Sequence, residues 1–208
     1  MIDIKDILFI LDRAHGKNVS GKQSPDGSFK EWEYSENVVS KLGKEMDKLG
    51  IPNDRTVIED YEVGLIERIR RGNELAKKTN LPIFISFHNN AGGGRGNELF
   101  LKKKPSKLEI EIGNIVANRI KNDFSDIPWR INTPDKLYKE GKFLVLYGSK
   151  KYNVYPQYNG MLIEFLFMDN ENDLNMLKDS KVFDKYIDTL LYSVVEICHF
   201  YKIGNFKL

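Results

Sequence analysis

The pattern of apolar and polar positions along the chain predicts an α/β fold. Three short apolar runs are typical of buried strands: residues 7–12, 81–87 and 161–167. Four longer stretches repeat apolar positions every three to four residues, as amphipathic helices do: residues 30–49, 63–78, 108–124 and 181–201. This alternation predicts a three-layer domain, in which helices flank a central, mostly parallel and twisted sheet.

Weaker signals complete the predicted order of elements. Residues 55–59, 97–102 and 143–147 are expected to form shorter strands, the last of them inside an irregular stretch rich in proline, glycine, lysine and tyrosine. The first long helix is expected to stop at Gly50, because a proline follows closely. No internal repeat, low-complexity tract or linker divides the chain, so we expect a single domain over residues 1–208.

The composition excludes several classes of protein. The chain has 208 residues, of which 41% are hydrophobic and 30% charged, as expected of a globular domain with a substantial core. Its 32 basic and 30 acidic residues balance to a net charge of +2, which argues against a nucleic-acid binder. No apolar run is long enough to cross a bilayer. The first residues lack a basic segment and a cleavage site, so we expect no signal peptide and synthesis in the cytoplasm.

Cysteine and histidine are scarce, which makes their positions informative. Cys198 is the single cysteine, so an internal disulfide and a thiolate metal cluster are excluded, and its apolar helical setting predicts a core residue. The three histidines are His15, His88 and His199. We expect His199 to cap or pack, because it lies in the last turn of the closing helix.

Polar side chains lie at the carboxyl ends of the three main predicted strands. His15 follows the first strand by a few residues, His88 directly follows the second, and Glu164 lies inside the third. Ligands of open α/β sheets bind beyond the carboxyl ends of the strands, so these three side chains should face one crevice. A histidine at such a position is more often structural than metal-bound. The carboxylate of Glu164, however, is costly to bury among apolar neighbours unless it is paired, metal-bound or protonated.

Two other motifs have competing interpretations. Residues 28–31 read Ser-Phe-Lys-Glu, a capping box in which Glu31 would close the start of the first long helix, and the local pattern favours this capping role. The glycine-rich segment at residues 89–96 lacks the lysine and the flanking pattern of a phosphate-binding loop, so we assign it no nucleotide.

Taken together, the ordered motifs resemble a known family. They read DRAHG, FKEWEY, LIERIRRGNELA, FISFHNNAGG, GNELFL and LIEFLFMDNENDLNML. This set resembles the zinc-dependent N-acetylmuramoyl-L-alanine amidases of the Amidase_3 type, over about residues 8–177. The family pattern has a D-x-G-H-G start, a glutamate that opens the next helix, an S-x-H-x-N-A strand end and a late V-E-x-G-F-x-x-N.

The resemblance implies a site. Matched motif by motif, the family's zinc ligands fall on His15, Glu31 and His88, and its catalytic glutamate falls on Glu164. Glu31 is preferred to Glu33 as the third ligand because its distance from the glycine that ends the helix matches the family's spacing.

The resemblance also implies three supporting or substrate-binding residues: Asn90, Glu98 and Asn170. The chain departs from the family in two places. Arg13 and Ala14 replace a Pro-Gly pair before the first histidine, and Phe165 and Leu166 replace a small residue and a glycine after the glutamate. The run FLFMDN is similar to phage-encoded members.

The function that the resemblance implies is hydrolysis of the amide between the lactyl group of muramic acid and L-alanine in peptidoglycan. Zn²⁺ would activate the attacking water and Glu164 would act as general base. We expect a monomer that binds neither a membrane nor nucleic acid and has no separate wall-binding domain. We expect it to act as a phage endolysin after holin-type release. The alternatives are another zinc amidohydrolase or carboxypeptidase that cleaves a different amide, and a non-catalytic wall-binding module.

Overall fold

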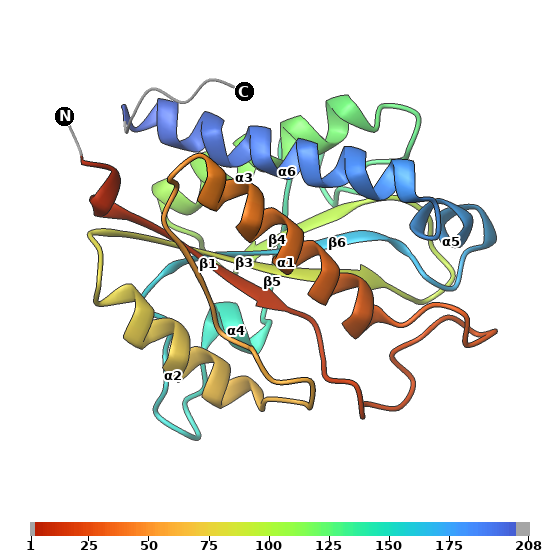
Figure 1. The fold of residues 1–208 in the computed structure, drawn as a ribbon, viewed down its shortest axis with the longest axis horizontal. Helices are drawn as coiled ribbons and strands as arrows, with labels where there is room; N and C mark the ends of the chain where they lie inside the picture. Colours follow the sequence, from red (N-terminus) through yellow and green to blue (C-terminus); the bar gives the residue numbers. More distant parts are fainter. Residues whose placement is uncertain (1–2, 203–208) are drawn as a thin grey trace.

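A six-stranded sheet in the order β2-β1-β3-β6-β4-β5 forms the centre of the computed structural model, which describes residues 3–202 (Figure 1). The strands are β1 (Ile7–Arg13), β2 (Asn53–Arg55), β3 (Leu81–Asn90), β4 (Glu98–Lys102), β5 (Lys139–Gly141) and β6 (Asn159–Phe167). Neighbouring strands are parallel except β4 and β6, so β4 and β5 run opposite to the other four. The predicted mostly parallel sheet is confirmed.

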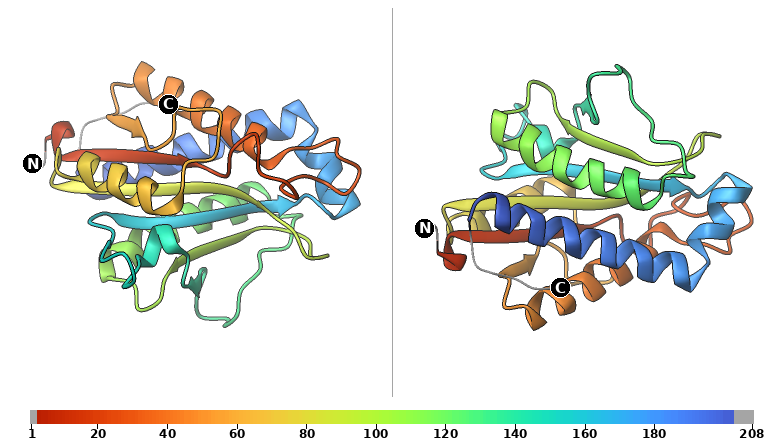
Figure 2. Two further views of the ribbon diagram at one scale, coloured as in Figure 1. Left: turned by 90° about the horizontal axis from the view of Figure 1, so that it is seen from below. Right: turned by 90° about the horizontal axis from the view of Figure 1, so that it is seen from above.

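Helices cover both faces of this sheet. The helices are α1 (Glu31–Lys48), α2 (Leu65–Ala76), α3 (Lys107–Asp123), α4 (Leu144–Tyr147), α5 (Glu171–Leu177) and α6 (Ser180–Phe200), and a short 3-10 turn, Ile4–Asp6, precedes β1. Helices α1, α3 and α6 pack on one face, α2 and α4 lie on the other, and α5 lies beyond the end of β6 (Figures 1 and 2). The three-layer arrangement expected from the sequence is therefore confirmed.

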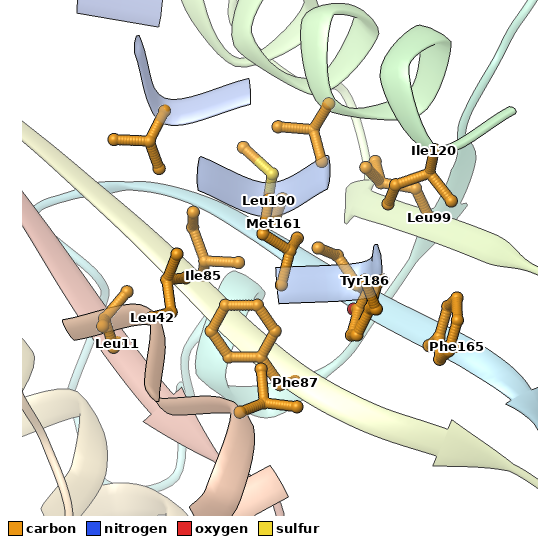
Figure 3. Close-up of a cluster of buried hydrophobic side chains, with 14 of the residues drawn as sticks. Leu11, Leu42, Ile85, Phe87, Leu99, Ile120, Met161, Phe165, Tyr186 and Leu190 are labelled. Carbon is orange, nitrogen blue, oxygen red and sulfur yellow. The ribbon is translucent and has the colours of Figure 1, made fainter. Parts of the chain in front are cut away.

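The larger part of the core lies between the sheet and the layer of α1, α3 and α6. Figure 3 shows Leu42 of α1 and Leu190 of α6 facing side chains of the sheet such as Ile85 and Met161. On the opposite face, a smaller cluster that includes Phe84 packs under α2 and α4. Since both faces of the central strands are buried, these strands read as continuous apolar runs and not as alternating ones.

The strand predicted at residues 143–147 is wrong, because this segment forms the single helical turn α4. The run of four apolar residues is too short for its periodicity to distinguish a strand from a helix. In the structure Val145 and Leu146 are buried in the smaller cluster, and Gly148 ends the turn with a positive φ of 81°.

Three short elements differ from the sequence-based expectation. Strand β2 lies at Asn53–Arg55 and not at residues 55–59, while β5 and α5 were not expected. Strand β2 has no apolar alternation, and its position depends on pairing with Phe9–Leu11 of β1, which the local pattern does not encode.

A bulge interrupts β6 directly after Glu164. His88 pairs with Glu164 and Asn90 pairs with Phe167, so β6 has one residue more than β3 in this interval. Leu166 has a φ of 63°, and its side chain is fully buried in the larger cluster. A non-glycine residue in this left-handed conformation costs about 1 kcal/mol, and burial of the leucine side chain offsets that cost. The bulge ends the regular pairing of β3 with β6 near the carboxyl ends of these strands, directly after Glu164.

The structure also tests the predictions for Cys198 and for membrane-spanning helices. Cys198 is buried in α6, as expected of a core residue. Among residues 3–202, no helix combines the length and the apolar character that crossing a bilayer requires.

Candidate metal centre and active site

Three side chains from distant parts of the chain converge at the carboxyl ends of β1 and β3. His15 Nε2 lies 3.5 Å from Glu31 Oε2, and His88 Nδ1 lies 3.0 Å from Glu31 Oε1. One donor atom from each of the three residues lies within 4.8 Å of the others. The imidazole side chains are 20% and 18% exposed and the carboxylate is 3% exposed, so the group lies at the base of a depression.

The loop after β1 holds His15 in an unusual backbone conformation. His15 has a φ of 39°, a left-handed value that costs free energy for a residue with a side chain. The buried guanidinium of Arg13 donates to the carbonyl oxygens of His15 and Glu59, and the Ala14 amide donates to Phe87 O at 3.1 Å. These bonds fix the histidine against β3 and against the loop that follows β2.

The first residue of α1 is Glu31, which the helix directs at the two histidines. Lys30 occupies the N-cap position, and its side chain makes no capping hydrogen bond. The capping-box interpretation is wrong, because Glu31 is the first and not the third residue of the helix, and its amide donates to Lys22 O at 3.1 Å instead of to the Ser28 hydroxyl. The alternative ligand Glu33 is exposed.

Burial and mutual contact set the protonation of the three side chains. Burial lowers the pKa of His15 to about 4, so this imidazole is neutral near pH 7. Burial alone would raise the pKa of Glu31, but its hydrogen bond with His88 and the charge there lower it overall. Burial likewise opposes charge on His88, and the carboxylates of Glu31 and Glu164 raise its pKa. Two imidazoles and one carboxylate are a donor set that can bind a divalent metal ion.

Beside this group, Glu164 lies on β6 directly opposite His88 of β3 and Glu98 of β4. Burial raises the pKa of Glu164 to about 7, and the charge of His88 partly counteracts that increase. Its Oε2 atom is buried and has no hydrogen-bond partner among residues 3–202. A buried carboxylate oxygen without a partner, with a pKa near neutrality, is suited to accept a proton from a bound molecule.

A cavity of about 280 Å³ connects His15, His88 and Glu164. Strand alternation directs Leu162 and Glu164 to the same face of the sheet, which is the face covered by α2 and α4. Apolar side chains also line the cavity: Leu65, Phe143, Leu144, Val145 and Leu162. The site is therefore a small amphiphilic pocket, of the kind that binds a substrate of limited size.

The three residues expected to support the site have other direct partners. Glu98 is buried and accepts from Arg130 Nε at 2.5 Å and Lys139 Nζ at 2.9 Å. Asn90 accepts from the neighbouring Ala91 amide at 2.8 Å. Asn170 is the N-cap of α5 and accepts from the backbone amides of residues 172 and 173. Glu98 lies beside Glu164 across β4 and β6, but none of the three residues lines the cavity.

Sequence reasoning missed several polar residues that hold the site together. The Asn89 amide N–H donates to Glu31 Oε1 at 3.3 Å, and its side chain donates to Phe165 O at 2.6 Å. The buried Asp12 carboxylate accepts from Ser86 Oγ at 2.7 Å and from Arg68 Nη1 at 3.3 Å.

One of these residues carried a detectable sequence signal. Arg68 lies in the buried stripe of α2, next to Ile69, one turn before Gly72 and two turns before Leu75 and Ala76, all of which are buried. A charged residue on the buried face of a helix indicates a specific partner, here the Asp12 carboxylate.

Comparisons with known proteins identify the family and the fold. The sequence model of a family described as N-acetylmuramoyl-L-alanine amidase, Amidase_3, matches residues 9–194. The catalytic domain of CwlV from Bacillus (Paenibacillus) polymyxa var. colistinus has a similar structure, with a TM-score of 0.74 and 17% identity over 95% of this chain and 99% of that one. A search of curated protein sequences returned no match.

Two further solved structures are similar. Ami1 of Mycobacterium smegmatis, an N-acetylmuramyl-L-alanine amidase, has a TM-score of 0.76 and 16% identity, over 94% of this chain and 98% of that one. The catalytic domain of CD27L, an endolysin targeting Clostridia difficile, has a TM-score of 0.62 and 17% identity, over 91% of this chain and 97% of that one. At these identities the likeness shows a shared fold.

Proposed function

Since this chain belongs to the N-acetylmuramoyl-L-alanine amidase family Amidase_3, we propose that it hydrolyses peptidoglycan at the amide between muramic acid and L-alanine by a zinc-dependent mechanism. The single observation that carries the proposal is the convergence of His15, Glu31 and His88 beside the unpartnered carboxylate oxygen of Glu164. We further propose that the chain acts as one catalytic domain, because both helical layers pack on the same sheet.

The three convergent residues fit a zinc ion. Neutral imidazole and carboxylate are ligands that zinc prefers, and the low pKa of His15 keeps that imidazole free of a proton. His15, Glu31 and His88 would hold the ion, and Glu164 would remain outside the ligand set. When bound, zinc supplies Lewis acidity that polarises the scissile carbonyl and makes the attacking water more acidic.

The chain's own residues would perform the proton transfers. Glu164 would accept a proton from the attacking water and deliver it to the leaving amine of L-alanine. Burial raises the pKa of Glu164 in the metal-free protein, which makes this carboxylate a stronger base than an exposed one. The apolar wall around Leu162 would limit the access of other water molecules to the reacting atoms.

We also propose a lytic role for this amidase, of the phage endolysin type. The likeness to the CD27L catalytic domain supports that role. So does the FLFMDN segment after Glu164, which is similar to phage-encoded members of the family.

Digestion of purified peptidoglycan tests the proposed reaction. The protein loaded with zinc is expected to release new L-alanine amino ends while the glycan strands keep their length. The Glu164→Gln variant, which preserves the shape of the side chain, is expected to bind zinc and release almost no ends. Amino ends of another residue would favour a different amidohydrolase or a carboxypeptidase. Near-normal turnover by Glu164→Gln would remove this residue from the role of base.

A further inference from the structure

One cation in the active-site cavity, the ammonium group of Lys22, has no partner among the residues that the structure describes. Lys22 lines the same cavity as His15, His88 and Glu164. Within the described range, residues 3–202, no carboxylate lies within ion-pair distance of its ammonium group. An unpaired cation beside a reaction centre is available to bind an anionic group of the substrate.

The other cation of the cavity, Arg68, is already fully engaged. Its guanidinium donates to Val63 O at 2.7 Å, to Asp12 at 3.3 Å and to Glu62 at 3.4 Å, and it is almost completely buried. Arg68 therefore helps to build the site. Lys22, which is only half-buried, is left to bind a ligand.

A rigid turn presents Lys22 to the cavity. Its carbonyl oxygen accepts from the Glu31 amide at 3.1 Å, so Lys22 is attached to the first residue of α1. Within the same turn the Ser24 amide donates to Phe29 O at 2.9 Å, and the Phe29 amide donates to Ser24 Oγ at 3.0 Å. Ser24 and Phe29 are both buried, which fixes the turn against the rest of the domain.

The charge of Lys22 acts on the groups that surround the reaction centre. It contributes to lowering the pKa of His15 and of Glu31, and it counteracts the increase in the pKa of Glu164. An anion bound at Lys22 therefore lies within electrostatic range of the reacting atoms.

The chemistry of the proposed substrate identifies the anion. The lactyl carboxyl group of muramic acid is consumed in the scissile amide, and N-acetylated sugars are uncharged. The nearest anionic group is the α-carboxylate of the second stem residue, a D-glutamate linked through its γ-carboxyl. A cavity of about 280 Å³ has room for alanine and this neighbour, but not for a longer segment of the peptide.

We propose that Lys22 binds the free α-carboxylate of the second stem residue and so makes the enzyme prefer an acidic stem to one amidated at this position. This inference rests on the proposed amidase function and adds a specificity-determining residue to it.

Two synthetic muramoyl tripeptides test the inference. Both have the sequence L-alanine, γ-linked D-glutamate, L-lysine, and they differ only in whether the second residue carries an α-carboxylate or an α-carboxamide. The wild-type enzyme is expected to show about tenfold higher kcat/KM for the carboxylate, as expected of one charge-assisted hydrogen bond. Lys22→Met should reduce this ratio to near one, and Lys22→Arg should retain most of it.

A matched control separates the role of Lys22 from a general effect of charge. Lys44 is an exposed lysine of α1 that does not line the cavity, so Lys44→Met should keep the wild-type ratio. An unchanged ratio in Lys22→Met would overturn the inference. An equal loss on both tripeptides would also overturn it, because Lys22 would then act on the reacting carbonyl.

Binding to the Glu164→Gln variant, measured by calorimetry, distinguishes failure of the inference from failure of the proposed function. The carboxylate tripeptide is expected to bind about tenfold more tightly than the carboxamide, and the added Lys22→Met change should abolish the difference. If this pattern holds while the wild type cleaves neither compound, the proposed reaction is wrong and the role of Lys22 stands. Equal affinities for the two tripeptides, or no binding of either one, would overturn the role of Lys22.

Discussion

Glu31 and Glu33 lie two residues apart in the first turn of the same helix, yet they have opposite environments. Glu31 is buried between two histidines, and Glu33 faces solvent. Because an α-helix advances about 100° per residue, side chains two positions apart point in nearly opposite directions. Burial and orientation, and not residue type, distinguish the candidate ligand from a surface carboxylate.

This pair supplies a matched test of the metal site. Glu31→Gln is expected to reduce zinc affinity by on the order of 100-fold or more, since it removes one anionic donor. Glu33→Gln makes the same chemical change on the exposed side and should leave zinc affinity within about twofold. Competition with a chromogenic chelator measures both affinities. A large loss in Glu33→Gln together with normal affinity in Glu31→Gln would reverse the ligand assignment.

The raised pKa of Glu164 predicts a pH-dependent difference in stability for the metal-free protein. The pKa rises from an ordinary value of 4.5 to about 7 on folding, so the folded state binds a proton that the unfolded state has released between these pH values. The stability of the wild type relative to Glu164→Gln should therefore be greatest below pH 4.5 and fall as the pH rises to about 7. The total change should be about 3 kcal/mol. Urea unfolding in the presence of a chelator measures it, and a difference that stays constant with pH would contradict the raised pKa.

Among the individual residues, some roles could be read from the chain and others could not. His15, His88 and Glu164 were identifiable because each lies at or near the carboxyl end of an apolar run. The role of Glu31 as a capping residue was wrong, because the helix begins at Glu31 itself and the Glu31 amide donates to Lys22 O. The residue at which a helix begins depends on the path of the preceding turn, which the local pattern does not fix.

At the scale of elements, α5 and the glycine-rich loop at residues 91–96 form one unit. Asp169, just before the helix, accepts from the Gly92 and Gly93 amides at 2.6 and 2.9 Å. Asp173 of α5 is completely buried and accepts from the Gly96 amide at 2.7 Å and the Phe167 amide at 3.0 Å. These bonds attach the loop that follows the His88 strand to the end of β6.

The two aspartates should contribute unequally to stability. Asp173→Ala leaves two buried amides without an acceptor and is expected to destabilise the protein by about 3 kcal/mol. Asp169→Ala exposes its two amides to water, which replaces the lost acceptor, and should cost less than about 1 kcal/mol. Urea unfolding of both variants measures the difference. Equal costs would indicate that burial does not determine the strength of this attachment.

At the scale of the whole molecule, the candidate metal site joins segments that are far apart in the chain. Its residues come from the loop after β1, the start of α1 and the end of β3. A ligand that binds only the folded chain stabilises it by mass action. Zinc should therefore stabilise the complete domain and not only one loop.

This linkage predicts a shift in melting temperature. Zinc at about 100 times its dissociation constant should add about 2.7 kcal/mol, which corresponds to a rise in Tm of roughly 5 to 10 °C for a domain of this size. The shift should disappear in His88→Ala and be reversed by a chelator in the wild type. Scanning calorimetry measures it, and an equal shift in His88→Ala would place the stabilising zinc elsewhere.

The sequence by itself determined the class of fold and the end of the central strands at which the candidate site lies. The long helices and the buried strands were predictable because burial of both sheet faces leaves a strong local signal of apolar runs and helical periodicity. The same signal located His15, His88 and Glu164 at strand ends, where a sheet of parallel strands brings side chains together.

The tertiary structure alone decided which buried polar groups support the site and which short elements form. The helical turn α4 and the strand β5 contain too few residues for a local pattern and depend on the surfaces they pack against. Glu98 and Arg68 find their partners, Arg130 and Asp12, in segments far apart in the chain. Lys22 reaches the cavity without an ion-pair partner among the described residues. Contacts of this kind depend on how the chain closes in space, and no local run of residues records them.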